Sequence, residues 1–106
     1  MLGFVRVAAV SDFSDGLVRV FDVDGVDVGV VSLGGRFHAF SGKCPHAGYV
    51  LNYTRVRPGD VILCSSHMAS FDLHTGRVLQ GPAEKDLRLY TVKVDSDDVL
   101  VSLGEG

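Results

Sequence analysis

The stretch VDVGVVSLGGRFHAF, residues 26–40, contains the pattern that decides the fold. Apolar residues alternate with polar or small ones in residues 26–31 and again in residues 36–40, which is the period of a half-buried β-strand. Gly34-Gly35 stands between the two runs and supplies the positive φ angles that a two-residue hairpin turn requires. The stretch therefore predicts two antiparallel strands joined by a tight turn.

The same period recurs on both sides of this hairpin, whereas no segment shows a helical period of useful length. Asp24-Gly25 is a second hairpin signal directly before the stretch. We therefore expect an all-β fold of about ten antiparallel strands. The further strand-like runs are residues 5–7, 17–21, 61–63, 69–73, 77–80, 87–94 and 99–103.

Length and composition limit the class of protein. The chain has 106 residues, of which 46% are hydrophobic and 22% charged, and this fits a single globular domain. A net charge of −3 argues against a nucleic-acid-binding protein. No apolar run approaches the ~20 residues of a membrane span, and Arg6 interrupts the apolar start that a signal peptide needs. We therefore expect a cytoplasmic protein whose cysteines stay reduced.

Both cysteines of the chain lie beside histidines, in Cys44-Pro45-His46 and in Cys64-Ser65-Ser66-His67. Each pair offers one thiolate and one imidazole, so a metal is a better use of the cysteines than a disulfide. Mixed pairs suit a two-iron cluster in which both sulfurs bind one iron and both imidazoles the other. A zinc ion with two cysteine and two histidine ligands is the competing interpretation, although zinc fingers usually pair like ligands. The remaining histidines, His38 and His74, are predicted to be a solvent-facing strand residue and a turn residue without a metal role.

Four segments together carry a resemblance to a known family. They are Cys44-Pro45-His46-Ala47-Gly48, Cys64-Ser65-Ser66-His67, Ser70-Phe71-Asp72-Leu73-His74-Thr75-Gly76 and Gly81-Pro82-Ala83. Through them, residues 4–101 resemble a Rieske-type ferredoxin of bacterial aromatic-ring-hydroxylating dioxygenase systems. The resemblance implies one Rieske 2Fe-2S cluster and a single Rieske domain over residues 1–106. It also implies a small cluster-binding subdomain, residues 41–84, set into a β base formed by residues 1–40 and 85–106.

The resemblance assigns a ligand set and a function. It implies that Cys44 and Cys64 hold one iron, that His46 and His67 hold the other, and that Gly81-Pro82-Ala83 closes over the cluster. It further implies a monomeric one-electron carrier, not itself an enzyme, between a flavoprotein NAD(P)H-dependent reductase and a terminal aromatic-ring-hydroxylating oxygenase. Two alternatives stay open at this point: a Rieske-like small subunit of another redox enzyme, such as assimilatory nitrite reductase, and a non-redox zinc-binding module.

The sequence departs from relatives at four positions around the second pair. The family commonly has a bulky residue and a glycine where this chain has Ser66 and Met68. High-potential relatives in respiratory complexes carry Ser and Tyr where this chain has Ala69 and Phe71, and they also carry an extra disulfide. Because hydrogen bonds to the sulfurs raise the potential, their loss predicts the low end of the Rieske range, about −150 mV.

Charge is distributed unevenly along the chain. Residues 41–84 contain four basic and three acidic residues, whereas the two flanks together contain six basic and ten acidic ones. The segments that the resemblance places around the cluster, residues 44–51, 64–71 and 80–83, contain no charged residue at all. We expect this uncharged tip to be a docking face, because it is easily desolvated during brief contacts with partners.

Overall fold

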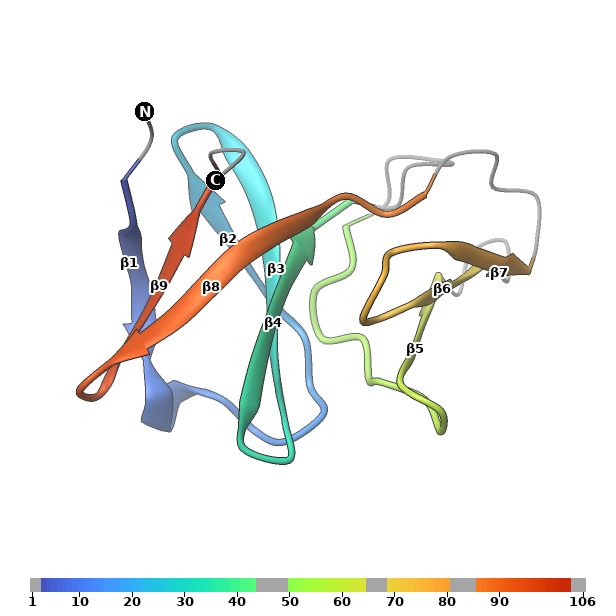
Figure 1. Ribbon diagram of the computed structural model, residues 1–106, viewed down its shortest axis with the longest axis horizontal. Helices are drawn as coiled ribbons and strands as arrows, with labels where there is room; N and C mark the ends of the chain where they lie inside the picture. Colours follow the sequence, from blue (N-terminus) through green and yellow to red (C-terminus); the bar gives the residue numbers. More distant parts are fainter. Residues whose placement is uncertain (1–2, 44–49, 65–68, 81–85, 104–106) are drawn as a thin grey trace.

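The computed structural model describes residues 3–43, 50–64, 69–80 and 86–103. Its strands form two antiparallel sheets (Figure 1). The larger sheet, which we call the base, has six strands in the order β1-β9-β8-β4-β3-β2. Its strands are β1 (Val5–Ala9), β2 (Arg19–Val23), β3 (Val26–Leu33), β4 (Arg36–Ser41), β8 (Leu89–Asp95) and β9 (Asp98–Ser102).

The smaller sheet lies beside the base and has three strands in the order β5-β6-β7 (Figure 1). These are β5 (Val61–Cys64), β6 (Ala69–Asp72) and β7 (Val78–Gln80). A three-residue 3-10 helix, η1 (Val10–Asp12), is the only helix among the described residues. No helix in these described ranges has the length and apolarity to cross a membrane.

The all-β, antiparallel prediction is confirmed. Every run predicted from the sequence coincides with a strand whose ends differ by at most two residues, a difference typical of frayed strand ends. Both predicted hairpin turns have the required backbone: φ is 50° and 82° at Asp24 and Gly25, and 60° and 84° at Gly34 and Gly35. The expectation of about ten strands compares with nine in the described ranges.

Alternation along the central strands divides the interior into two hydrophobic clusters. Val30 of β3 and Ala39 of β4 belong to one cluster, on the face of the base that also buries Val99 and Val101 of β9. The neighbouring residues Val31 and Phe40 point to the opposite face, because successive side chains of a strand alternate. They pack there against residues of the small sheet and its connections, namely Leu51, Ile62, Ala69, Phe71, Leu73 and Leu87.

This second cluster joins the two sheets, and we call it the shared core. Phe40, Ile62 and Phe71 are its largest fully buried side chains and come from β4, β5 and β6. Burial of each such side chain stabilises the fold by about 1.5–3 kcal/mol. Because these side chains come from both sheets, the shared core fixes the position of the small sheet against the base.

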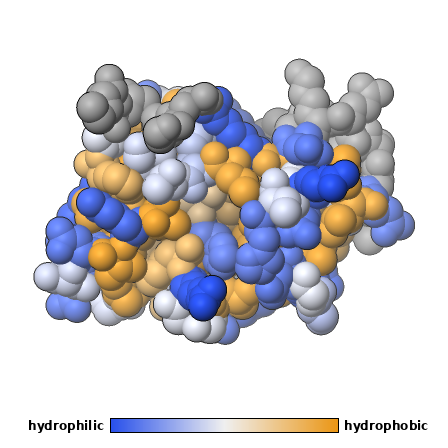
Figure 2. All heavy atoms as spheres, viewed as in Figure 1, coloured by the Kyte–Doolittle hydropathy of each residue, from blue (hydrophilic) through white to orange (hydrophobic). Residues whose placement is uncertain are grey.

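On the face seen in Figure 2, exposed hydrophobic side chains lie in separate groups over both sheets, with hydrophilic ones between them.

Candidate metal centre

The first predicted ligand pair lies in a loop whose two ends are held together. Lys43 and Val50 form an antiparallel bridge on either side of residues 44–49. The Leu51 amide donates to the Gly42 carbonyl at 2.8 Å, and the Gly42 amide donates to the Asp27 carbonyl at 2.8 Å. These bonds tie the loop ends to β3 of the base.

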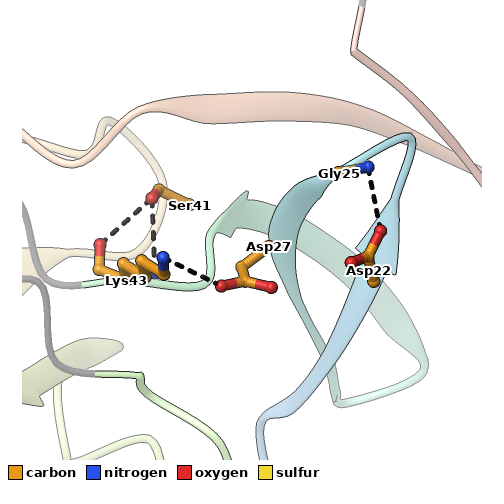
Figure 3. A network of polar contacts seen from close by, with 5 residues as sticks. All are labelled: Asp22, Gly25, Asp27, Ser41 and Lys43. Atoms are coloured by element: carbon orange, nitrogen blue, oxygen red, sulfur yellow. Dashed lines mark hydrogen bonds and ion pairs between the residues drawn. The ribbon is translucent and has the colours of Figure 1, made fainter.

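Side-chain contacts also hold the ends of the first ligand loop to the base. The Lys43 ammonium lies 3.4 Å from an Asp27 carboxylate oxygen (Figure 3). The Ser41 hydroxyl donates to the Lys43 carbonyl at 3.0 Å and accepts from the Lys43 amide at 3.3 Å. On the neighbouring hairpin the Asp22 carboxylate accepts from the Gly25 amide at 2.9 Å, which caps the β2–β3 turn (Figure 3). The chain therefore enters the first ligand loop from a rigid base.

The second predicted pair begins at the end of β5. Cys64 is the last residue of that strand and lies opposite Ala69, the first residue of β6. Residues 65–68 connect the two strands, so this ligand loop is closed by the β5–β6 ladder. The Gly81-Pro82-Ala83 segment follows Gln80, the last residue of β7, which pairs with Ser70 of β6.

Most of the predicted ligand set lies outside the described residues. The backbone of Cys64 is described, whereas Cys44, His46, His67 and the 81–83 segment lie outside the described residues. The described loop ends nevertheless converge on the shared core, since Leu51 and Ala69 are both buried there beside Ile62 and Phe71. Two ligand segments whose flanking residues rest on one core, each with one cysteine and one histidine, fit a cluster shared between them.

A group of titratable side chains that the sequence analysis did not connect lies where the two sheets meet. The rings of His38 and His74 make an edge-to-face contact with centroids 5.1 Å apart. His74 Nε2 lies 2.8 Å from an Asp60 carboxylate oxygen. His38 comes from β4, His74 from the turn between β6 and β7, and Asp60 from the turn before β5.

The predicted solvent-facing position of His38 needs correction. The side chain is half-buried, and burial lowers the pKa of His38 below its usual range. The neighbouring His74 lowers this pKa further, whereas Asp60 raises it and Arg36 lowers it by smaller amounts. Within the described ranges, no three His, Cys, Asp or Glu side chains are arranged to hold a metal ion, and this includes His38, His74 and Asp60.

No local signal in the sequence could have revealed this contact. His38 follows an alternating strand pattern and His74 a turn pattern, and 36 positions separate them in the chain. Only the packing of the small sheet against the base brings β4 and the β6–β7 turn together.

Comparisons with known proteins agree with the architecture and the candidate centre. Residues 3–91 match the sequence model of the Rieske [2Fe-2S] domain. The ferredoxin component of an alkene monooxygenase system from Xanthobacter autotrophicus is 36% identical over 98 residues, which cover 92% of this chain and 80% of the relative. The ferredoxin component of biphenyl 2,3-dioxygenase from Rhodococcus jostii is 31% identical over 105 residues, which cover 99% and 97%.

Solved structures show the same relationship. The ferredoxin of carbazole 1,9a-dioxygenase from Nocardioides aromaticivorans IC177 superposes with a TM-score of 0.86 at 35% identity, covering 92% of this chain and 95% of that one. A chain in a complex of reduced oxygenase and oxidized ferredoxin in carbazole 1,9a-dioxygenase gives a TM-score of 0.84 at 29% identity, covering 93% and 92%. The likeness thus extends over nearly the full length of free-standing ferredoxin components.

Proposed function

Because this chain belongs to the Rieske [2Fe-2S] domain family, we propose that Cys44, His46, Cys64 and His67 hold its one Rieske 2Fe-2S cluster. In this assignment Cys44 and Cys64 bind one iron, and His46 and His67 bind the other. Two features support it: these residues include both cysteines of the chain, and the described ends of both loops rest on the shared core.

The ligand set accounts for the chemistry of the bound group. Two ferric irons, two sulfides and two thiolates sum to zero charge, so reduction by one electron creates a single negative charge. A four-thiolate cluster already carries two negative charges before reduction, which makes a further electron harder to add. A cluster held by these four residues would therefore exchange one electron at a higher potential than the cluster of a plant-type ferredoxin.

The protein is an electron carrier of an oxygenase system and not itself an oxygenase. The observation that carries this conclusion is the match to ferredoxin components along 92% of this chain and 80% of the relative. The relatives serve different systems, named for an alkene monooxygenase, a biphenyl dioxygenase and a carbazole dioxygenase. We assign this chain an aromatic-ring-hydroxylating oxygenase as acceptor and a flavoprotein NAD(P)H-dependent reductase as donor.

Three further assignments complete the proposal. The cluster-binding subdomain spans residues 41–84, and the base spans residues 1–40 and 85–106. The protein acts as a monomer, since a carrier has to free its tip in order to meet two partners in turn. It works in the cytoplasm, where NAD(P)H is available to the reductase and the cysteines stay reduced.

Metal and sulfide analysis together with a redox titration tests this function. The purified protein should contain about two irons and two acid-labile sulfides per chain and should take up about one electron. Its reduced state should be paramagnetic, with an average g value below that of all-thiolate 2Fe-2S clusters. A colourless protein with one zinc ion would contradict the assignment and support the non-redox alternative.

A further inference from the structure

A groove of about 590 Å³ runs along one side of the small sheet. Its walls are residues 52–57, which form a turn at 52–53 and then run extended, and Leu63 of β5. Leu63 directly precedes Cys64, and residue 52 follows closely after Val50, which closes the first ligand loop. The groove is therefore lined by described residues that adjoin both ligand loops in the chain.

Two arginines face this groove. Arg55 and Arg57 are exposed, while Val56 between them is partly buried against the shared core. Arg55 forms an antiparallel bridge with Leu17, and Arg57 forms one with Val61 of β5, so the segment is extended at both positions. Since side chains two residues apart in an extended segment point the same way, both guanidinium groups lie on the groove side.

Neither guanidinium has an acidic partner within the described part of the chain. Two basic side chains elsewhere are paired, since Arg6 lies 2.8 Å from Asp98 and Lys43 lies 3.4 Å from Asp27. The carboxylate of Asp60, in the turn after Arg57, contacts His74 instead. The groove thus presents two positive charges that pair with no described carboxylate, on a protein whose net charge is −3.

The groove borders exposed apolar surface. Tyr53 is 63% exposed and Val50 is 52% exposed. Tyr53 has φ at +65°, its amide donates to the Val18 carbonyl at 2.7 Å, and the Arg19 guanidinium lies 5.7 Å from the centroid of its ring. Tyrosine and arginine are both enriched at protein–protein interfaces, so an exposed tyrosine beside arginines is typical of such a surface.

The arginines lie close enough to the predicted cluster to influence electron exchange. Arg57 is paired with Val61, which stands three residues before Cys64 in the same strand. Three residues of a strand span about 10 Å, which equals the Debye length at 0.1 M ionic strength. Charges at this distance attract an oppositely charged partner while the cluster loops make contact with it.

We propose that the groove formed by residues 52–57 and Leu63 is a docking surface for a redox partner protein that presents carboxylates beside its own redox centre. This inference rests on the proposed carrier function. A protein is the fitting occupant because it can neutralise Arg55 and Arg57 and cover Tyr53 and Val50 at the same time. A small anion would leave the apolar rim exposed. In this proposal the uncharged tip makes the contact for electron transfer, and Arg55 and Arg57 in the adjoining groove orient the partner protein.

Single-turnover oxidation of the reduced protein by ferricyanide tests the positive charge beside the electron exit. In this step one electron leaves the reduced protein, and ferricyanide becomes ferrocyanide. At low ionic strength, Arg55→Glu and Arg57→Glu should each slow the reaction about threefold or more, and the difference should vanish at high salt. Arg36→Glu is the matched control because it makes the same change in net charge. Arg36 begins β4, about 17 Å along the strand from Ser41, so this variant should stay close to the native rate.

A capped hexaglutamate peptide tests the carboxylate preference without relying on electron transfer. It should shift the side-chain NMR signals of Arg55 and Arg57 and inhibit the ferricyanide reaction of the native protein. It should do neither in the Arg55→Glu, Arg57→Glu double variant. Capped hexalysine and chloride of equal ionic strength are the controls and should leave the arginine signals in place.

The outcomes separate this inference from the proposed function. Equal slowing by Arg36→Glu, or peptide shifts located elsewhere on the protein, would overturn the docking surface while leaving the carrier intact. A native protein with no reducible chromophore would overturn the carrier function, and the peptide titration would still decide whether the groove binds carboxylates. Iron content and the visible spectrum of each variant establish that it is folded.

Discussion

At the scale of single residues, the four histidines fall into two pairs with different roles. His46 and His67 belong to the proposed ligand set, whereas His38 and His74 contact each other at the junction of the two sheets. His46→Ala or His67→Ala should remove a ligand and cause loss of the cluster, or leave a labile one. His38→Ala and His74→Ala are the controls and should retain about two irons per chain. Iron analysis of the four purified variants checks this, and a bleached His38→Ala protein would refute the ligand assignment.

Two residues of β6 are expected to set the reduction potential. Ala69 lies opposite Cys64 in the ladder, and Ala69 and Phe71 are both fully buried in the shared core. Ala69→Ser and Phe71→Tyr introduce hydroxyls at the positions where high-potential relatives carry them. A hydrogen bond donated to a sulfur stabilises the more negative reduced state, so each variant should raise the midpoint potential.

The expected rise is on the order of 65–130 mV per hydroxyl, because a hydrogen bond to a charged group contributes about 1.5–3 kcal/mol in favourable cases and about 1.4 kcal/mol corresponds to about 59 mV for one electron. A redox titration of each variant and of the double variant measures it. Ser102→Ala is the control for a change of a buried hydroxyl elsewhere in the protein. It removes the hydroxyl of Ser102 in β9 of the base and should leave the midpoint potential unchanged. An intact cluster with an unchanged potential in the double variant would show that these positions do not face the sulfurs.

At the scale of elements, one glycine determines how closely the β6–β7 turn approaches the segment that leads into β8. Gly76 has φ at +76°, and its carbonyl accepts from the Leu87 amide at 2.6 Å. A Cβ at this position would overlap the Leu87 carbonyl oxygen. The obstacle is backbone, so no rotamer change can relieve it. Only glycine therefore satisfies both the left-handed conformation and the close contact.

Gly76→Ala should accordingly destabilise the protein by on the order of 2–4 kcal/mol, since strain in φ adds to the clash. Gly35→Ala is the matched control, because Gly35 also has a positive φ, at +84°, but an added methyl group there would have no other atom within 4 Å. It should cost only about 1–2 kcal/mol. Thermal unfolding of both variants under identical conditions measures the difference. Equal shifts in Tm would mean that the Leu87 contact adds nothing to the cost.

At the scale of the whole molecule, the His38, His74 and Asp60 contact makes the junction of the two sheets sensitive to pH. Burial and the nearby His74 lower the pKa of His38 in the folded protein. The unfolded chain therefore binds a proton at His38 more readily than the folded protein does. Stability linked to His38 is fully present above the ordinary pKa of 6.5 and is lost as the pH falls below that value.

Denaturant unfolding of the native protein and of His38→Gln at pH 8, 6.5 and 5.5 measures this linkage. The native protein's advantage over the variant should be largest at pH 8 and should shrink toward pH 5.5. The difference between the two proteins isolates His38, because both share every other titrating group. A difference that grows on acidification would show that the charged imidazole is the form stabilised in the fold.

Local sequence was sufficient to predict the strands and to indicate a metal centre. The alternation in residues 26–40 and the Gly34-Gly35 turn produce β3, β4 and their hairpin as expected, because a two-residue period and a positive φ are properties of neighbouring residues. The Cys–His pairs likewise point to a metal centre by donor types and spacing, while the resemblance to the Rieske family favoured a two-iron cluster over zinc.

The tertiary structure decided which of these elements touch. His38 meets His74, Leu87 approaches Gly76, and Arg55 and Arg57 line a groove with Leu63 only because the shared core holds the small sheet against the base. Each of these contacts joins residues whose local patterns are ordinary for a strand, a turn or an extended segment. Their juxtaposition depends on burial summed over the shared core, which no short window of sequence contains.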